Sequence, residues 1–295
     1  MCAVAIDYDP NPQYQEYAHP EHVVSAAWLS ARLGAPGLKV VESNEDSLLY
    51  NIGHIPGAVR IDWQKDLNDQ VSRDFIDGEA FAALMTDKGI ARDDTVVIYG
   101  DKANWWACYT LWVFELFGHP DVRLLDGGRD AWMGEERETS FSVPDYRAKP
   151  YPVVERNDAD FRIFVDELRD LVGGPTTILD ARGELEYTGE SLGIEGEGAA
   201  GVLRGGHIPG ALSYPWGRSV YPNARFRPRQ DIENAYSALD KNNHTIAYCQ
   251  LGDRSAHTWF VLKYLLGFDN IRNYDGSWAE WGNMVRVPIT QGDRP

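Results

Sequence analysis

The residue best suited to covalent chemistry in this sequence is Cys249, which follows a short β-favouring run and precedes a helical pattern. In an open α/β sheet, ligands bind beyond the carboxyl ends of the strands, so we expect this cysteine at such an edge. Loop N–H groups and the positive end of the helix favour an anion there, which predicts a thiol pKa below the free value of about 8.5. We interpret Cys249 as a nucleophile. Its loop continues through Gln250, Leu251, Gly252, Asp253, Arg254 and Ser255.

Two arginines could bring an anionic substrate to this thiol. Arg254 lies five positions after Cys249, and Arg182 follows another predicted strand. A guanidinium is permanently charged and donates to oxyanions, although either arginine could instead form an ordinary ion pair. The formal net charge of -17 means that a small anion needs such a local positive site. Asp253 would repel an anion, so we expect it to face outward.

The other two cysteines do not compete with Cys249. Cys108 falls inside a helical run among aromatic residues, where packing is its expected role, and Cys2 lies at the N-terminus. Three widely separated cysteines are typical of reduced thiols in a cytoplasm rather than of a disulfide framework. No Cys-x-x-Cys pair or His-rich cluster suggests a metal site.

The chain contains an internal repeat. Residues 53–58 read Gly-His-Ile-Pro-Gly-Ala, the same six residues recur at 206–211, and a tryptophan follows each copy at the same distance. Seven later positions of the first copy also match the second without gaps: Tyr99, Ala107, Gly118, Arg123, Asp126, Gly127 and Trp132. The repeat predicts a tandem duplication. We expect one domain at 1–145, a proline-containing linker at 146–157 and a second domain at 158–295.

The repeat also separates chemistry from structure. Where the second copy has Cys249, the first copy has Gly100 and no thiol in the loop that follows. A shared structural need would have kept similar residues in both copies, so we expect only the second domain to be catalytic. His54 and His207 are present in both copies, which indicates a structural role in a turn.

Short apolar strands alternate with helices of about ten residues. In the second copy we expect helices at 164–172 and 255–266, the latter amphipathic, and strands at 176–179, 245–248 and 270–274. Alternation of this kind predicts parallel strand pairing. The expected fold class is therefore α/β, with two domains that are each a small, mostly parallel sheet flanked by helices.

The acidic net charge argues against binding to nucleic acids or anionic membranes, since both are polyanions. No run approaches the about 18 apolar residues that span a bilayer, and the N-terminus does not resemble a signal peptide. We expect a cytoplasmic protein, and two fused copies favour a monomer.

Two tandem α/β domains, a His-Ile-Pro-Gly motif in each, and a cysteine loop in the second resemble the two-domain rhodaneses, from about residue 20 to residue 284. These are the thiosulfate and 3-mercaptopyruvate sulfurtransferases. The resemblance implies a ping-pong reaction through a persulfide on Cys249, with the backbone of 249–254 as the sulfur cradle and Arg182 binding the anion. It also implies a silent first domain, a thiophilic acceptor such as cyanide or a thiol, and no metal or organic cofactor.

The loop favours thiosulfate as the donor. Mercaptopyruvate enzymes typically show Cys-Gly-Ser/Thr-Gly-Val-Thr, whereas the sixth loop position here is Arg254, as in the thiosulfate type. The lysine that some thiosulfate enzymes place third is replaced by Leu251. 3-Mercaptopyruvate stays open as the alternative donor.

Two other classes of protein are weighed against a sulfurtransferase. Related cysteine phosphatases use Cys-x5-Arg, but Arg254 is only five positions after Cys249 and the sixth is Ser255. The loop is therefore expected to be too tight for a phosphoryl group. A binding module without chemistry is disfavoured because Cys249 is present.

Overall fold

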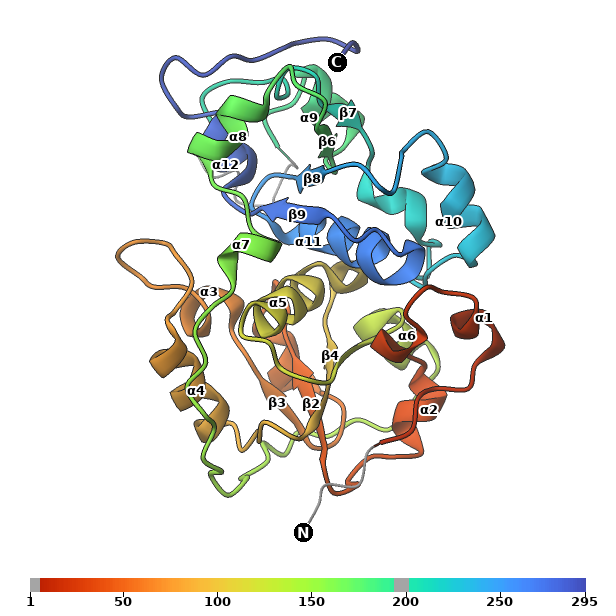
Figure 1. Cartoon of the computed structure of the whole chain (residues 1–295). Coiled ribbons are helices and arrows are strands. Elements are labelled where there is room, and N and C mark those ends of the chain that lie inside the picture. Colours follow the sequence, from red (N-terminus) through yellow and green to blue (C-terminus); the bar gives the residue numbers. More distant parts are fainter. Residues whose placement is uncertain (1–5, 194–201) are drawn as a thin grey trace. The chain divides into compact units, whose positions relative to one another are not determined.

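In the computed structural model, residues 6–193 and 202–295 are described, and the chain divides into two compact units (Figure 1). The first unit comprises Met1–Asn157 together with Tyr221–Phe226, and the second comprises Asp158–Val220 and Arg227–Pro295. Cys2 lies outside the described residues. Both units are built around a parallel sheet with helices, so the predicted α/β fold class is confirmed.

The first unit contains a five-stranded parallel sheet in the order β1-β5-β4-β2-β3. Its strands are almost entirely buried and rich in Val, Ile and Leu, as expected for a parallel sheet covered on both faces. The strands are β1 Val23–Val24, β2 Leu38–Glu42, β3 Ala58–Arg60, β4 Thr95–Tyr99 and β5 Val122–Leu125.

Side chains cap the N-termini of helices α1 to α4 in the first unit. Ser25 accepts from the Trp28 N–H at the start of α2, and Asp77 accepts from the Ala80 N–H at the start of α4. The helices are α1 Pro12–Gln15, α2 Ala26–Ser30, α3 Trp63–Asp66, α4 Gly78–Asp87, α5 Trp105–Leu116 and α6 Gly128–Gly134, with short 3₁₀ helices η1 Pro20–His22, η2 Leu49–Ile52 and η3 Lys102–Asn104.

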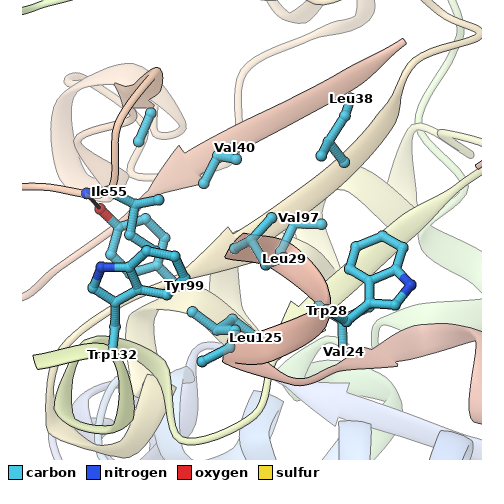
Figure 2. Close-up of a cluster of buried hydrophobic side chains, with 12 residues drawn as sticks. Val24, Trp28, Leu29, Leu38, Val40, Ile55, Val97, Tyr99, Leu125 and Trp132 are labelled. Carbon is cyan, nitrogen blue, oxygen red and sulfur yellow. Dashed lines mark hydrogen bonds between the residues drawn. The ribbon is translucent and has the colours of Figure 1, made fainter. Parts of the chain in front are cut away.

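The core of the first unit surrounds Tyr99 at the end of β4 (Figure 2). Its hydroxyl accepts the Ile55 N–H at 2.9 Å, drawn as a dashed line in Figure 2, and donates to the buried carboxylate of Glu42. In the second unit the matching Tyr248 accepts from Ile208 at 3.2 Å and donates to Asp180 at 2.5 Å. Both copies of the repeat thus have a tyrosine hydroxyl that links a backbone N–H to a carboxylate inside the apolar core.

The second unit has a four-stranded parallel sheet in the order β7-β6-β8-β9. Its strands are β6 Thr177–Asp180, β7 Leu212–Ser213, β8 Thr245–Tyr248 and β9 Ile271–Tyr274. Its helices are α7 Asp158–Phe161, α8 Val165–Leu171, α9 Glu184–Thr188, η4 Trp216–Ser219, α10 Arg229–Ala235, α11 Asp253–Phe260, the π-helical η5 Val261–Leu266 and α12 Ser277–Trp281. Because β8 lies between β6 and β9, the loop after it leaves the middle of the sheet.

The strand predicted at 245–248 is confirmed as β8. A helix is present over the predicted range 255–266, but its start and the helix type of its second half differ from the prediction. Helix α11 begins earlier, at Asp253, and continues as a π-helix over Val261–Leu266, and every residue of α11 is buried. Helix α11 is covered on more than one side because it packs on β8 and β9 and also against η4.

The segment predicted as a linker, 146–157, is bound along the first unit. The Tyr146 hydroxyl donates to the Gly57 carbonyl at 2.8 Å, and the Asn157 N–H donates to the Leu116 carbonyl at 2.8 Å. These contacts place the segment with the first unit.

The two motif histidines have the structural role that the repeat indicates. His54 is fully buried and stacks on Tyr50, with 3.8 Å between the ring centroids. Its Nδ1 lies 2.8 Å from the carbonyl oxygen of Tyr50. In the second unit, His207 stacks on Tyr187 with 3.7 Å between the ring centroids, and its Nδ1 lies 2.8 Å from the Tyr187 carbonyl oxygen. Each histidine thus anchors the turn that leads into a strand.

Candidate active site

The loop from β8 to α11 wraps around the Cys249 sulfur, which is fully buried. The Gly252 N–H donates to Sγ at 3.1 Å, and the Ser255 hydroxyl lies 3.4 Å from it. Gly252 has a φ of 102°, and a Cβ there would lie 3.1 Å from the Cα of Asp275, so the turn requires glycine. This geometry matches the cradle predicted for the loop backbone, and the cradle's role stays a prediction.

The start of α12 holds the loop from the other side. The Cys249 N–H donates to the Ser277 hydroxyl at 3.0 Å, and the Trp278 N–H donates to the Cys249 carbonyl at 3.0 Å. The Ser277 hydroxyl also lies 4.0 Å from Sγ. Sequence reasoning missed Ser277. A signal existed, because the repeat places Gly128 at the equivalent position of the first copy.

Ser277 adopts a left-handed backbone conformation, with φ at 53°, and Gly128 adopts nearly the same conformation at 52°. Such a conformation is strained for any residue with a Cβ, at a cost of about 1–3 kcal/mol. A Cβ at Gly128 would lie 2.1 Å from Asn104 Oδ1, so the first copy has no room for a side chain there. The second copy tolerates the strain and gains a hydroxyl beside the nucleophile.

Asp253 faces the sulfur of Cys249, so the expectation that it points outward is wrong. Its Oδ1 lies 3.3 Å from Cys249 Sγ, and the residue is 5% exposed. The reason is that α11 begins at Asp253, and this first position of the helix directs the side chain back to the end of β8. A buried carboxylate therefore contacts Sγ of Cys249.

The prediction of a lowered thiol pKa is also wrong. Burial, and then the carboxylate of Asp253, raise the pKa of Cys249, and they outweigh the opposing effects of Arg254 and Ser255. Burial likewise raises the pKa of Asp253, against the opposing effects of Arg254 and Cys249. Loop N–H groups and a helix N-terminus favour a thiolate, but here they act in a site where desolvation is the larger effect.

Arg254 is in the first turn of α11, where its guanidinium forms a two-pronged ion pair with Glu186 of α9. Nη1 donates to Oε2 at 2.7 Å and Nη2 donates to Oε1 at 2.9 Å, and both side chains are buried. Burial alone would raise the pKa of Glu186, but the ion pair outweighs it and holds the pKa below its usual range. Glu186 is therefore a second carboxylate of this site, and no pattern in the sequence predicted it.

Arg182 has partners of its own. Its guanidinium donates to Asp180, with Nη2 at 2.6 Å from Oδ2, and to the Gly206 carbonyl at 2.7 Å. It also lies over the Trp278 ring, 4.5 Å from the centroid. Arg182 is 1% exposed, so Asp180 neutralises it inside the core. Its predicted role as an anion-binding residue has no support from these contacts.

The middle of the loop contains a buried amide. Gln250 is 8% exposed, and neither its Oε1 nor its Nε2 has a hydrogen-bond partner among the described residues. Its own backbone carbonyl accepts the Ala279 N–H at 3.0 Å. Leu251, the next residue, is half-buried.

The equivalent loop of the first unit is arranged differently. Lys102, Ala103 and Asn104 have φ values of 45°, 53° and 68°, and the Asn104 side chain accepts the Gly100 N–H at 2.9 Å. The amide of Asn104 therefore binds the backbone of Gly100, the residue that aligns with Cys249. Cys108, the described cysteine of this unit, is buried in α5, and burial raises its pKa.

No group of three or more His, Cys, Asp or Glu side chains is placed to hold a metal ion within residues 6–193 and 202–295. Over the same described ranges, no helix is long and apolar enough to cross a membrane.

A sequence model of the rhodanese-like domain matches the chain twice, at residues 25–135 and 164–284. The chain belongs to the rhodanese family. The thiosulfate sulfurtransferase of Corynebacterium glutamicum is 64% identical over 98% of this chain and 97% of that protein. SseA of Mycobacterium tuberculosis is 56% identical over 97% of this chain and 96% of that protein. The crystal structure of YnjE is similar in fold, with a TM-score of 0.82 and 25% identity over 94% of this chain and 70% of that one.

These similarities confirm the family that the sequence resembles and the prediction of a sulfurtransferase enzyme, since the match to C. glutamicum extends over nearly the whole of both chains. An enzyme of this class has a sulfur donor and a sulfur acceptor.

Proposed function

We propose that this rhodanese-family enzyme moves the outer sulfur of thiosulfate to cyanide or a thiol through a persulfide on Cys249. The observation that supports this most directly is the sulfur itself. Cys249 Sγ lies at the end of the central strand β8, with the Gly252 N–H 3.1 Å away and the Ser255 hydroxyl 3.4 Å away. These donors can stabilise negative charge on sulfur before and after transfer.

The reaction has two half-reactions. In the first, Sγ of Cys249 attacks the outer sulfur of thiosulfate, a new S–S bond forms, and the bond to the sulfonate sulfur breaks with its electron pair leaving as sulfite. In the second, the acceptor attacks the outer sulfur of the persulfide, and the electron pair returns to Cys249. Cyanide leaves as thiocyanate, and no oxidant or reductant is needed.

Arg254 is the cation that we propose for the sulfonate of the donor. It lies in the same turn as the nucleophile, and its charge interacts with both Cys249 and Asp253. Glu186 offsets part of that charge by accepting hydrogen bonds from Nη1 and Nη2. We propose Arg182 as a second residue that contacts the anion, although its ion pair with Asp180 reduces the positive charge it can offer.

The second domain, 158–295, is the one we propose as catalytic, and 1–145 as non-catalytic, with 146–157 between them. The support is the contrast between the equivalent loops, since Gly100 supplies no thiol and the Asn104 amide closes the loop around its N–H.

Thiosulfate is favoured over 3-mercaptopyruvate because a dianion suits Arg254, and because the relative from C. glutamicum is named a thiosulfate sulfurtransferase. A comparison of rates with both donors, using cyanide and a thiol as acceptors, tests this choice. Clearly faster turnover of 3-mercaptopyruvate would reverse it. We also propose that the enzyme acts in the cytoplasm and is a monomer. Sedimentation of the purified chain measures its oligomeric state.

The persulfide is tested by incubation with thiosulfate, removal of the donor, and measurement of the intact mass. We expect a gain of one sulfur in the wild type and in Cys108→Ala, which removes the buried cysteine of the first unit. We expect no gain in Cys249→Ser. An unchanged wild-type mass, or a gain that persists in Cys249→Ser, would favour a binding module. Cys249-dependent hydrolysis of an aryl phosphate would favour a phosphatase.

A further inference from the structure

The titratable group in contact with the nucleophile is Asp253, whose Oδ1 lies 3.3 Å from Cys249 Sγ. Both groups are buried. The charged side chains around this pair are Arg254, which follows it on α11, and Glu186 of α9, which is bound to Arg254. The uncharged hydroxyls of Ser255 and Ser277 complete the polar contacts of the sulfur.

We propose that Asp253 is a catalytic residue, which takes the proton of the Cys249 thiol as the sulfur attacks the donor. This inference rests on the proposed function and adds a proton acceptor to it. The thiol donates toward Oδ1 in the free enzyme, so no rearrangement is needed for the transfer.

The step balances in atoms and charge. Before it, the site holds a neutral thiol, one carboxylate and the thiosulfate dianion. The Sγ–H bond breaks and the proton moves to Oδ1 of Asp253, while Sγ bonds to the outer sulfur and sulfite departs with the electron pair. After it, the site holds a persulfide anion, a neutral carboxylic acid and the sulfite dianion. The total charge of minus three is unchanged, and the acid can donate a hydrogen bond to the new anion.

Sharing one proton solves an electrostatic problem of this buried site. A thiolate and a carboxylate side by side would carry two negative charges where a dianion must bind, which is costly at low dielectric. One proton held between Cys249 and Asp253 leaves a single negative charge, opposed by Arg254. Burial raises the pKa of both groups, and this agrees with retention of that proton near neutral pH.

The first repeat shows what the fold alone requires at this position. Asn104 stands where the second repeat has Asp253, and its Oδ1 accepts the Gly100 N–H at 2.9 Å. Only the repeat that carries the nucleophile has a group that can accept a proton, and that group contacts the sulfur. Asp253→Asn keeps the size and shape of the side chain and removes its negative charge.

The test measures persulfide formation from thiosulfate in a single turnover, as a function of pH, in wild type and Asp253→Asn. We expect the variant to be slower near neutral pH by about 100-fold or more, the usual contribution of a general base. We expect its rate to rise with pH as the buried thiol ionises unaided. Asp166→Asn is the matched control, since it removes one charge from a 92% exposed side chain of the same unit.

A variant as fast as wild type or faster near neutral pH would overturn the proposal, because Asp253 would then only repel the donor. A second readout, the ultraviolet absorbance of the thiolate measured against Cys249→Ser, needs no substrate. We expect a two-step titration in wild type, as for a coupled pair, and one step in Asp253→Asn. A single step in both contradicts proton sharing. A wild type that titrates in two steps but forms no persulfide contradicts the proposed function instead.

Discussion

Glu186 binds both terminal nitrogens of Arg254, at 2.7 and 2.9 Å, and the two side chains are almost fully buried. Arg254 is the cation nearest in sequence to the nucleophile, so its pairing sets how much positive charge the site can offer to a donor. Glu186 also holds the guanidinium in place beside the loop. The pair therefore combines a structural role with the proposed binding role.

Replacement of Arg254 by Gln should lower both stability and activity. It leaves Glu186 buried without its cation, at a cost of about 3–5 kcal/mol in the free energy of unfolding. The double variant Glu186→Gln/Arg254→Gln should recover much of that loss, because neither side chain is then charged. Its kcat/KM for thiosulfate should stay at least about 10-fold low, since a charge-assisted contact is worth about 1.5–3 kcal/mol. Urea unfolding and steady-state kinetics separate the two effects, and wild-type kcat/KM in the double variant would make Arg254 purely structural.

Arg182 should behave differently from Arg254. Since Asp180, the Gly206 carbonyl and the Trp278 ring hold its guanidinium inside the core, Arg182→Gln should reduce the free energy of unfolding by about 3 kcal/mol. Its effect on kcat/KM for thiosulfate, measured on folded protein, should be smaller than that of Arg254→Gln. A larger effect would restore Arg182 as the main anion-binding residue.

Ser277 offers a matched pair of substitutions. Ser277→Ala removes the hydroxyl that accepts the Cys249 N–H but keeps a Cβ on a backbone with φ at 53°. Ser277→Gly removes the hydroxyl and also the strain. We expect the glycine variant to be more stable than the alanine variant by about 1 kcal/mol. Both should slow persulfide formation by a similar factor, because both lose the hydroxyl. Equal stability would show that the backbone is not strained, and unchanged rates would exclude a role of the hydroxyl.

The features that could be predicted from the sequence are those that depend on the internal repeat or on the spacing of apolar residues. The comparison of the two copies singled out Cys249 because the first copy has Gly100 there, and it predicted a structural role for His54 and His207. It could also have identified Ser277, because Gly128 occupies the same position in the first copy. The strand at 245–248 followed from a short apolar run that ends at the loop.

The electrostatics of the site could not be predicted in this way. Arg254 and Glu186 are 68 residues apart, and the pairing depends on how α9 and α11 pack, which no local pattern encodes. The direction of Asp253 depends on a helix that begins two residues before the predicted start. The thiol pKa follows from burial, which opposes the loop and helix effects that the sequence does reveal.

Gln250 is the residue for which stability and activity should move in opposite directions. Its amide is buried next to the nucleophile, and neither Oε1 nor Nε2 has a hydrogen-bond partner among the described residues. A buried polar group without a partner costs about 1–3 kcal/mol, whereas an apolar side chain of similar shape costs nothing of this kind. Gln250→Met should therefore raise the free energy of unfolding by about 1 kcal/mol or more, and Leu251→Met, a swap at the half-buried neighbour, should change it little. If the amide instead receives the sulfonate oxygens of the donor, the same variant should lower kcat/KM for thiosulfate several-fold while the rate at saturating donor changes less. Urea unfolding together with donor titration measures both quantities, and a destabilised Gln250→Met would show that the amide is already satisfied in the folded chain.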